Sequence, residues 1–143
     1  MAVILPDVNV LIYAFRRDAV DHVQYRDWLD SVVNSGSVYG IAPQVLGSVV
    51  RILTNQRAFR DLYPVEEVLA FGDTLLSQRN CQVIQPEKKH WEIFSDLCRL
   101  SNARGNVVPD AWLAALAIEH GCEWITTDRD FARFPGLRWR TPF

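Results

Sequence analysis

The chain has 143 residues, of which 49% are hydrophobic and 22% charged, a balance that suits one globular domain and excludes disorder or low complexity. No apolar run approaches the ~20 residues of a membrane-spanning helix, no signal peptide is recognisable, and the three cysteines are widely spaced, so we expect a cytoplasmic protein. The net charge of -2 argues against a protein that coats nucleic acid through bulk positive charge, but it leaves room for a nuclease whose acids hold metal ions.

The N-terminal stretch sets a pattern that the chain repeats, in which a short apolar strand stops at an acid and a helix follows. Residues 3–5 are β-branched and leucine-rich, as in a strand that is buried on both faces, and Pro6 ends it because proline cannot donate to a sheet ladder. Asp7 therefore follows the carboxyl end of a strand, where ligands bind in open α/β sheets. Taken alone, Asp7 is better explained as the N-cap of a helix over residues 8–17.

Helices and strands alternate along the rest of the chain, which predicts an α/β fold with a mainly parallel, Rossmann-like central sheet flanked by helices. No linker or repeat interrupts this order, so we predict a single domain over residues 1–143. Val23, Trp91 and Leu100 are expected to face the core from their helices. The helices are predicted over residues 22–34, 43–53, 65–78, 87–103, 107–120 and 130–133, and the strands over residues 38–42, 80–85, 124–127 and 137–139.

Three acids lie where strand ends and helix starts meet. Asp7 and Asp128 each follow a predicted strand, and Asp110 lies in the first turn of an alanine-rich helix. Because the carboxyl ends of parallel strands and the following helix N-termini share one edge of the sheet, we expect the three carboxylates to cluster. Clustered carboxylates repel one another unless they are protonated or bridged by cations, and their hard oxygens suit Mg²⁺ or Mn²⁺. Each acid alone is also explained as a helix cap or as a complement to the helix dipole.

Three short motifs follow one another at this edge. They are Asp7-Val8-Asn9, then Asp110-Ala111 at the start of an alanine-rich helix, then Thr126-Thr127-Asp128-Arg129-Asp130-Phe131. In this order they resemble the PIN domain, and more narrowly the VapC-type toxin ribonucleases of bacterial toxin–antitoxin pairs. The resemblance extends over nearly the whole chain. It implies a divalent-metal-dependent endoribonuclease that forms a homodimer and is blocked by a cognate VapB-type antitoxin.

Position by position, the resemblance makes three acids the catalytic and metal-binding residues: Asp7, Asp110 and Asp128. Asn9 matches the polar residue that often accompanies the first acid, and Asp130 is expected to support the site through water. The adjacent Thr127 either bonds to a carboxylate or simply ends its strand. The expected cofactor is Mg²⁺ or Mn²⁺, which activates a water for attack on the phosphodiester bonds of RNA.

The chain departs from the PIN pattern in the helix predicted over residues 43–53. Most PIN domains carry a Glu near the position of Gly47, and residues 43–54 contain no acid here. A subgroup of VapC-like proteins shares a Gly and a following Arg at these positions, and Arg51 either contacts a phosphate or lies as a cation on the helix surface. The missing acid leaves open whether one or two ions act, because Glu66 and Glu67 belong to another helix.

Two other functions stay open on the sequence. A catalytically silent PIN-like protein that binds RNA or a partner is favoured by the missing Glu and opposed by the three acids. A haloacid-dehalogenase-like phosphatase also begins with a strand-terminal Asp, but it needs a second acid two residues later, where this chain has Asn9. We therefore predict a toxin endoribonuclease, whose target RNA the sequence does not name.

Overall fold

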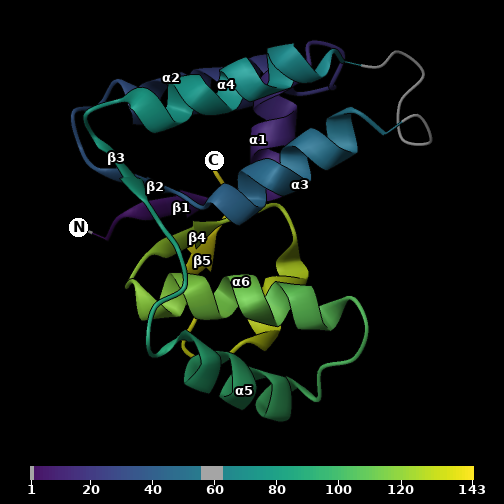
Figure 1. Cartoon of the computed structure of the whole chain (residues 1–143), viewed down its shortest axis with the longest axis vertical. Helices are drawn as coiled ribbons and strands as arrows, with labels where there is room; N and C mark the ends of the chain where they lie inside the picture. Colours follow the sequence, from purple (N-terminus) through teal and green to yellow (C-terminus); the bar gives the residue numbers. More distant parts are fainter. Residues whose placement is uncertain (1, 56–62) are drawn as a thin grey trace.

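The computed structural model describes residues 2–55 and 63–143 and contains one five-stranded sheet with helices on both faces (Figure 1). The predicted alternation of strands and helices is confirmed. The helices are α1 (Val8–Phe15), α2 (His22–Val33), α3 (Pro43–Leu53), α4 (Val65–Ser77), α5 (His90–Ser101) and α6 (Val107–Glu119), followed by a short 3-10 helix, η1 (Arg129–Arg133). The strands are β1 (Ile4–Pro6), β2 (Tyr39–Ile41), β3 (Cys81–Val83), β4 (Glu123–Ile125) and β5 (Trp139–Arg140).

The sheet has the strand order β3-β2-β1-β4-β5, and every pair of neighbouring strands is parallel. The first strand of the chain therefore lies at the centre. In the register between β1 and β4, Leu5 lies opposite Trp124 and Pro6 opposite Ile125. The ladder continues for one bond past the strand, since the Asp7 N–H donates to the Ile125 carbonyl at 2.8 Å. The expected mainly parallel sheet is thus confirmed.

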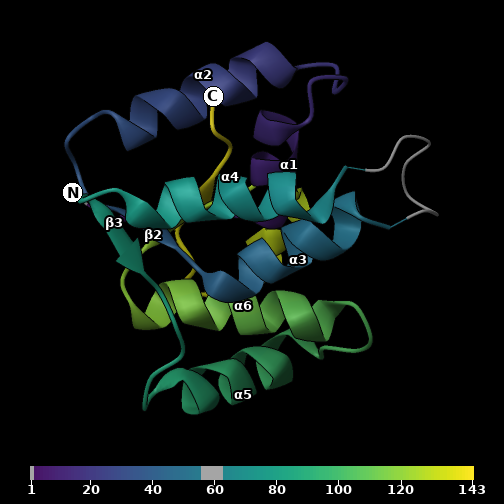
Figure 2. The same cartoon turned by 45° about the horizontal axis from the view of Figure 1, so that its top comes forward.

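The helices form two layers around this sheet. Helices α5 and α6 pack together over one face, and α1, α2 and α4 lie over the other, with α3 against α1 and α4 (Figures 1 and 2). The core between these layers holds large side chains that are almost fully buried, among them Leu5, Leu11, Tyr39, Leu116 and Trp124. None of the helices in the described part of the chain combines the length and the apolarity needed to cross a membrane.

The predicted inward orientation is wrong for three apolar side chains. Trp91 and Leu100 are 67% and 68% exposed on α5, and Val23 is 57% exposed on α2. Helix α5 packs against α6, so it buries one face, on which His90 and Leu97 lie. Successive residues are separated by 100° around a helix, so Trp91 points away from that face, and its ring lies 5.5 Å from that of Phe94.

Candidate active site

Asp7 combines the two interpretations that the sequence offered. It is the N-cap of α1, where its Oδ1 accepts from the Val8 N–H at 2.6 Å. Its Oδ2 accepts from the Thr126 hydroxyl at 2.7 Å, and the residue is only 6% exposed. Burial raises the pKa of Asp7, the bonds from Thr126 and Val8 lower it, and the charge of Asp128 raises it further. The capping acid therefore also belongs to a charged cluster.

Thr126 joins the ends of the two central strands. Strand β4 ends at Ile125, two residues earlier than predicted, and Thr126 is fully buried. Its hydroxyl donates to Asp7 and accepts from the Asp128 N–H at 3.0 Å. A carboxylate bond is one of the two predictions for Thr127, but Thr126 makes that bond. The register of β1 against β4 identifies Thr126 as the partner of Asp7, because these two residues come directly after the paired residues Pro6 and Ile125.

The third acid, Asp110, lies in the first turn of α6 and is partly buried. Its pKa is raised to about 6, first by burial and then by the negative charges of Asp128 and Asp7. Asp130 acts in the same direction with a smaller effect, and the cation of Arg133 opposes it. The structure therefore brings Asp7, Asp110 and Asp128 to the same edge of the sheet, where they repel one another.

These acids do not yet form a set of ligands around one point. Within residues 2–55 and 63–143, no three side chains of aspartate, glutamate, histidine or cysteine are placed so that they could hold one ion. Asp128 is instead occupied as the N-cap of η1, where its Oδ1 accepts from the Asp130 N–H at 2.9 Å. In this structure the three acids therefore influence one another through their charges, but they do not surround one point.

The three remaining expected site residues lie at different distances from the acids. Asn9 is exposed in the first turn of α1, close to Asp7 in the chain. Asp130 is exposed on η1, where its Oδ2 lies 3.8 Å from Nη2 of Arg133. Arg51 is exposed in the last turn of α3, where it complements the helix dipole.

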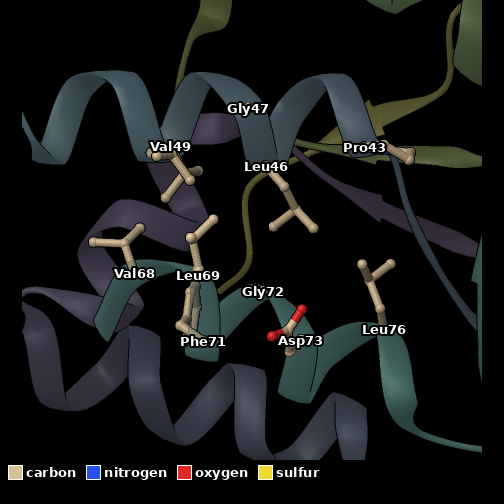
Figure 3. Close-up of a pocket in the computed structure, with 11 residues that line it drawn as sticks. Pro43, Leu46, Gly47, Val49, Val68, Leu69, Phe71, Gly72, Asp73 and Leu76 are labelled. Carbon is tan, nitrogen blue, oxygen red and sulfur yellow. The ribbon is translucent and has the colours of Figure 1, made fainter. Parts of the chain in front are cut away.

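The acids of α4 do not replace the Glu that α3 lacks. Asp73 lines a mostly apolar groove of about 240 Å³ between α3 and α4, into which Leu46 points from α3 toward Gly72 (Figure 3). Glu67 lines a separate cavity formed with α1 and α2. A Cβ added at Gly47 would meet no atom within 4 Å. Gly47 therefore leaves open space on α3, and no close helix contact requires it.

The raised pKa of Asp110 predicts a stability change with a definite pH dependence. The folded state keeps a proton on Asp110 between the ordinary pKa of 3.8 and about 6. The stability that this protonation provides is complete below the lower value and is lost as the pH rises through the upper one. In EDTA at about pH 8, Asp110→Asn should therefore raise the free energy of unfolding by ~1 kcal/mol after solvent screening, and the melting temperature should rise with it. Near pH 4 the variant should melt like the wild type, whereas an offset that is the same at every pH would contradict the electrostatic explanation.

Comparisons with known proteins agree with the fold. The family model described as PIN domain matches residues 4–137. The chain therefore belongs to the PIN domain family, and the resemblance drawn from its motifs is confirmed.

More particularly, the similar curated proteins are VapC ribonucleases. Ribonuclease VapC43 of Mycobacterium tuberculosis is 38% identical over 136 residues, which cover 95% of this chain and 92% of that protein. Ribonuclease VapC25 of the same organism is 35% identical over 138 residues, covering 96% and 97%. The fold is also that of a chain in the crystal structure of VapBC2 from Rickettsia felis bound to a DNA fragment from their promoter. The TM-score is 0.70 at 19% identity, and the match covers 97% of this chain and 98% of that chain.

Proposed function

We propose that this protein is a divalent-metal-dependent endoribonuclease and the toxin of a VapBC-type toxin–antitoxin pair. The observation that carries the proposal is the electrostatic coupling of Asp7, Asp110 and Asp128 at the carboxyl edge of a PIN domain sheet. The names of its relatives, which are VapC ribonucleases at 35–38% identity, support RNA as the substrate class. The haloacid-dehalogenase alternative is set aside because the PIN domain model accounts for residues 4–137.

The residues at this edge fit Mg²⁺ or Mn²⁺. Their donors are carboxylate oxygens, which these hard cations prefer, and a cation would relieve the repulsion that raises the pKa of Asp110. Asp7 already accepts one bond at each oxygen, but every carboxylate oxygen has a second lone pair for a metal. When bound, the ion supplies an activated water and neutralises charge on the phosphodiester. Asp7, Asp110 and Asp128 are the residues that would hold the ion.

The protein itself contributes orientation and charge. Thr126 and the Val8 N–H fix both oxygens of Asp7, so one ligand is held in place before any ion arrives. Asp130 supports Asp128 through its backbone N–H, and its own carboxylate, which is exposed beside Arg133, can hold a water. We assign Asn9 and Thr127 to the rim of the site. Arg51, far along α3, is at most a contact for a distant phosphate of the RNA.

The decisive experiment is a cleavage assay on structured RNA with and without metal. We expect cleavage with Mg²⁺ or Mn²⁺, its loss in excess EDTA, and its recovery when the ion is added back. Cleavage that persists in EDTA would overturn the metal-dependent mechanism.

A second candidate function is a protein that binds RNA or a partner without cleaving. It is favoured by the absence of an acid from α3. The same assay distinguishes the two, because a silent protein would bind the RNA and leave it intact at every metal concentration.

We also propose that residues 1–143 act as one domain, in the cytoplasm, as a homodimer bound by a VapB-type antitoxin. The similar structure from Rickettsia felis is that of VapBC2, and this is the support for the partner. Light scattering of the protein alone should give the mass of a dimer, and a larger complex should form when the antitoxin is added. A monomer at high concentration would exclude the dimer.

A further inference from the structure

A cavity of about 440 Å³ opens beside the acids, and the proposed cleavage reaction does not use it. Thr127 connects the two, because it lines the cavity and lies between Thr126, which is bonded to Asp7, and Asp128. The volume falls within the range of small-ligand pockets. The other walls come from α1, the turn after it and α2, and include Tyr13, Arg16, Asp18, Ala19 and Tyr25.

One side of the cavity is aromatic and held in place by ring contacts. The rings of Tyr13 and Tyr25 lie 5.0 Å apart at an interplanar angle of 54°. The ring of Phe143 packs edge-on against Tyr25, also at 5.0 Å. Both tyrosines are partly buried, so each presents part of a ring to the cavity. Aromatic side chains of this kind are the usual stacking surface for unpaired bases.

The other side of the cavity is charged, and hydrogen bonds join its side chains. Arg16 forms two bonds to Asp18, from Nη2 at 2.9 Å and from Nε at 3.2 Å. The Tyr63 hydroxyl donates to the same carboxylate at 3.0 Å, and these bonds lower the pKa of Asp18 to about 2. A permanent guanidinium is suited to a phosphate, and carboxylates are suited to the amino groups of adenine, cytosine and guanine. A further carboxylate, that of Asp21, lines the same cavity.

We propose that this cavity is a nucleobase subsite for the nucleotide next to the scissile phosphate. A base stacks on the rings of Tyr13 and Tyr25, while the ion pair of Arg16 and Asp18 lines the charged side of the cavity. Asp18 and Asp21 favour bases that carry an amino group over uracil. The position of the base next to the scissile phosphate rests on the proposed function. The subsite itself concerns the binding of RNA and not its cleavage.

Binding of labelled RNA decamers in EDTA tests the subsite without any cleavage. Tyr25→Leu removes the ring and keeps an apolar side chain, so the affinity for oligoadenylate should fall by about 5- to 150-fold. Tyr25→Phe keeps the ring and should bind like the wild type. Trp91→Leu is the matched control, because it removes an exposed ring from α5, over the opposite face of the sheet. The wild type should also bind oligoadenylate more tightly than oligouridylate.

A second variant and a crosslink guard against a folding defect. Ala19→Phe fills the cavity from the turn between α1 and α2, and it should weaken binding without removing a core ring. Irradiation of an oligoadenylate decamer that contains 8-azidoadenosine should crosslink it to Tyr13 or Tyr25. Unchanged affinity in folded Tyr25→Leu and Ala19→Phe, crosslinks confined to other elements, or no decamer binding at all would overturn the subsite.

The outcomes also separate the subsite from the proposed function. If RNA stays intact in every metal but Tyr25→Leu weakens decamer binding, the subsite stands and the nuclease proposal fails. If cleavage is metal-dependent but Tyr25→Leu binds decamers normally, the nuclease stands and the subsite fails. If Tyr25→Leu loses affinity for the antitoxin but binds decamers normally, the cavity belongs to that partner and the RNA subsite is overturned.

Discussion

Replacing Asp7 by alanine should abolish RNA cleavage and relieve the growth arrest that a VapC-type toxin causes in cells. Asp7 is the acid that the structure fixes most firmly, by bonds at 2.6 and 2.7 Å from two different elements. Without it, Asp110 and Asp128 cannot orient an ion and its water. We expect the fold to survive, since the lost N-cap costs ~1 kcal/mol and the variant no longer buries a carboxylate whose pKa is raised.

Two controls make this result specific. Asp7→Asn keeps the size of the side chain and one acceptor for the cap, so it should lose cleavage with a smaller change in melting temperature. Asp96→Ala removes an exposed acid that pairs with Arg99 on α5, and it should cleave like the wild type. Circular dichroism and a melt of each variant establish that the protein is folded. Normal cleavage by folded Asp7→Ala protein would refute the metal-nuclease mechanism at its centre.

The fold was accessible from the sequence because its signals are local. The apolar run before Pro6, the acid after it and the alternation of strands and helices each depend on a few neighbouring residues. These signals placed Asp7, Asp110 and Asp128 at strand ends and helix starts, and the structure has them there. The exposure of Trp91 and Leu100 was not accessible, because it depends on which neighbours cover α5.

The details of the site were less accessible because they depend on pairing between distant segments. Thr126 and Thr127 are identical in type, and only the register of β4 against β1 selects Thr126 as the partner of Asp7. At Gly47 a Cβ would touch nothing within 4 Å, so helix packing does not require a glycine at this position. Gly47→Glu should therefore fold, and Mn²⁺ titration would show whether the new acid strengthens metal binding.

The threonine that joins the two central strands should matter almost as much as the acids. Thr126→Val keeps the shape of the side chain but removes the donor to Asp7 and the acceptor for the Asp128 N–H. Because Thr126 is fully buried, the groups left unpaired should cost ~1–3 kcal/mol of stability. Cleavage should fall by about 10- to 100-fold, as it does when a residue that orients a metal ligand is lost.

A pH profile separates this positioning role from a loss of stability. The bond from Thr126 lowers the pKa of Asp7, so that pKa should rise further in Thr126→Val. The carboxylate is the form that binds a cation, and the acid limb of the cleavage profile should therefore move to higher pH. Thr126→Ser restores the hydroxyl, so it should return the profile to its original position even if the smaller side chain lowers the melting temperature. If Thr126→Val cleaves with an unshifted profile, Thr126 only stabilises the fold.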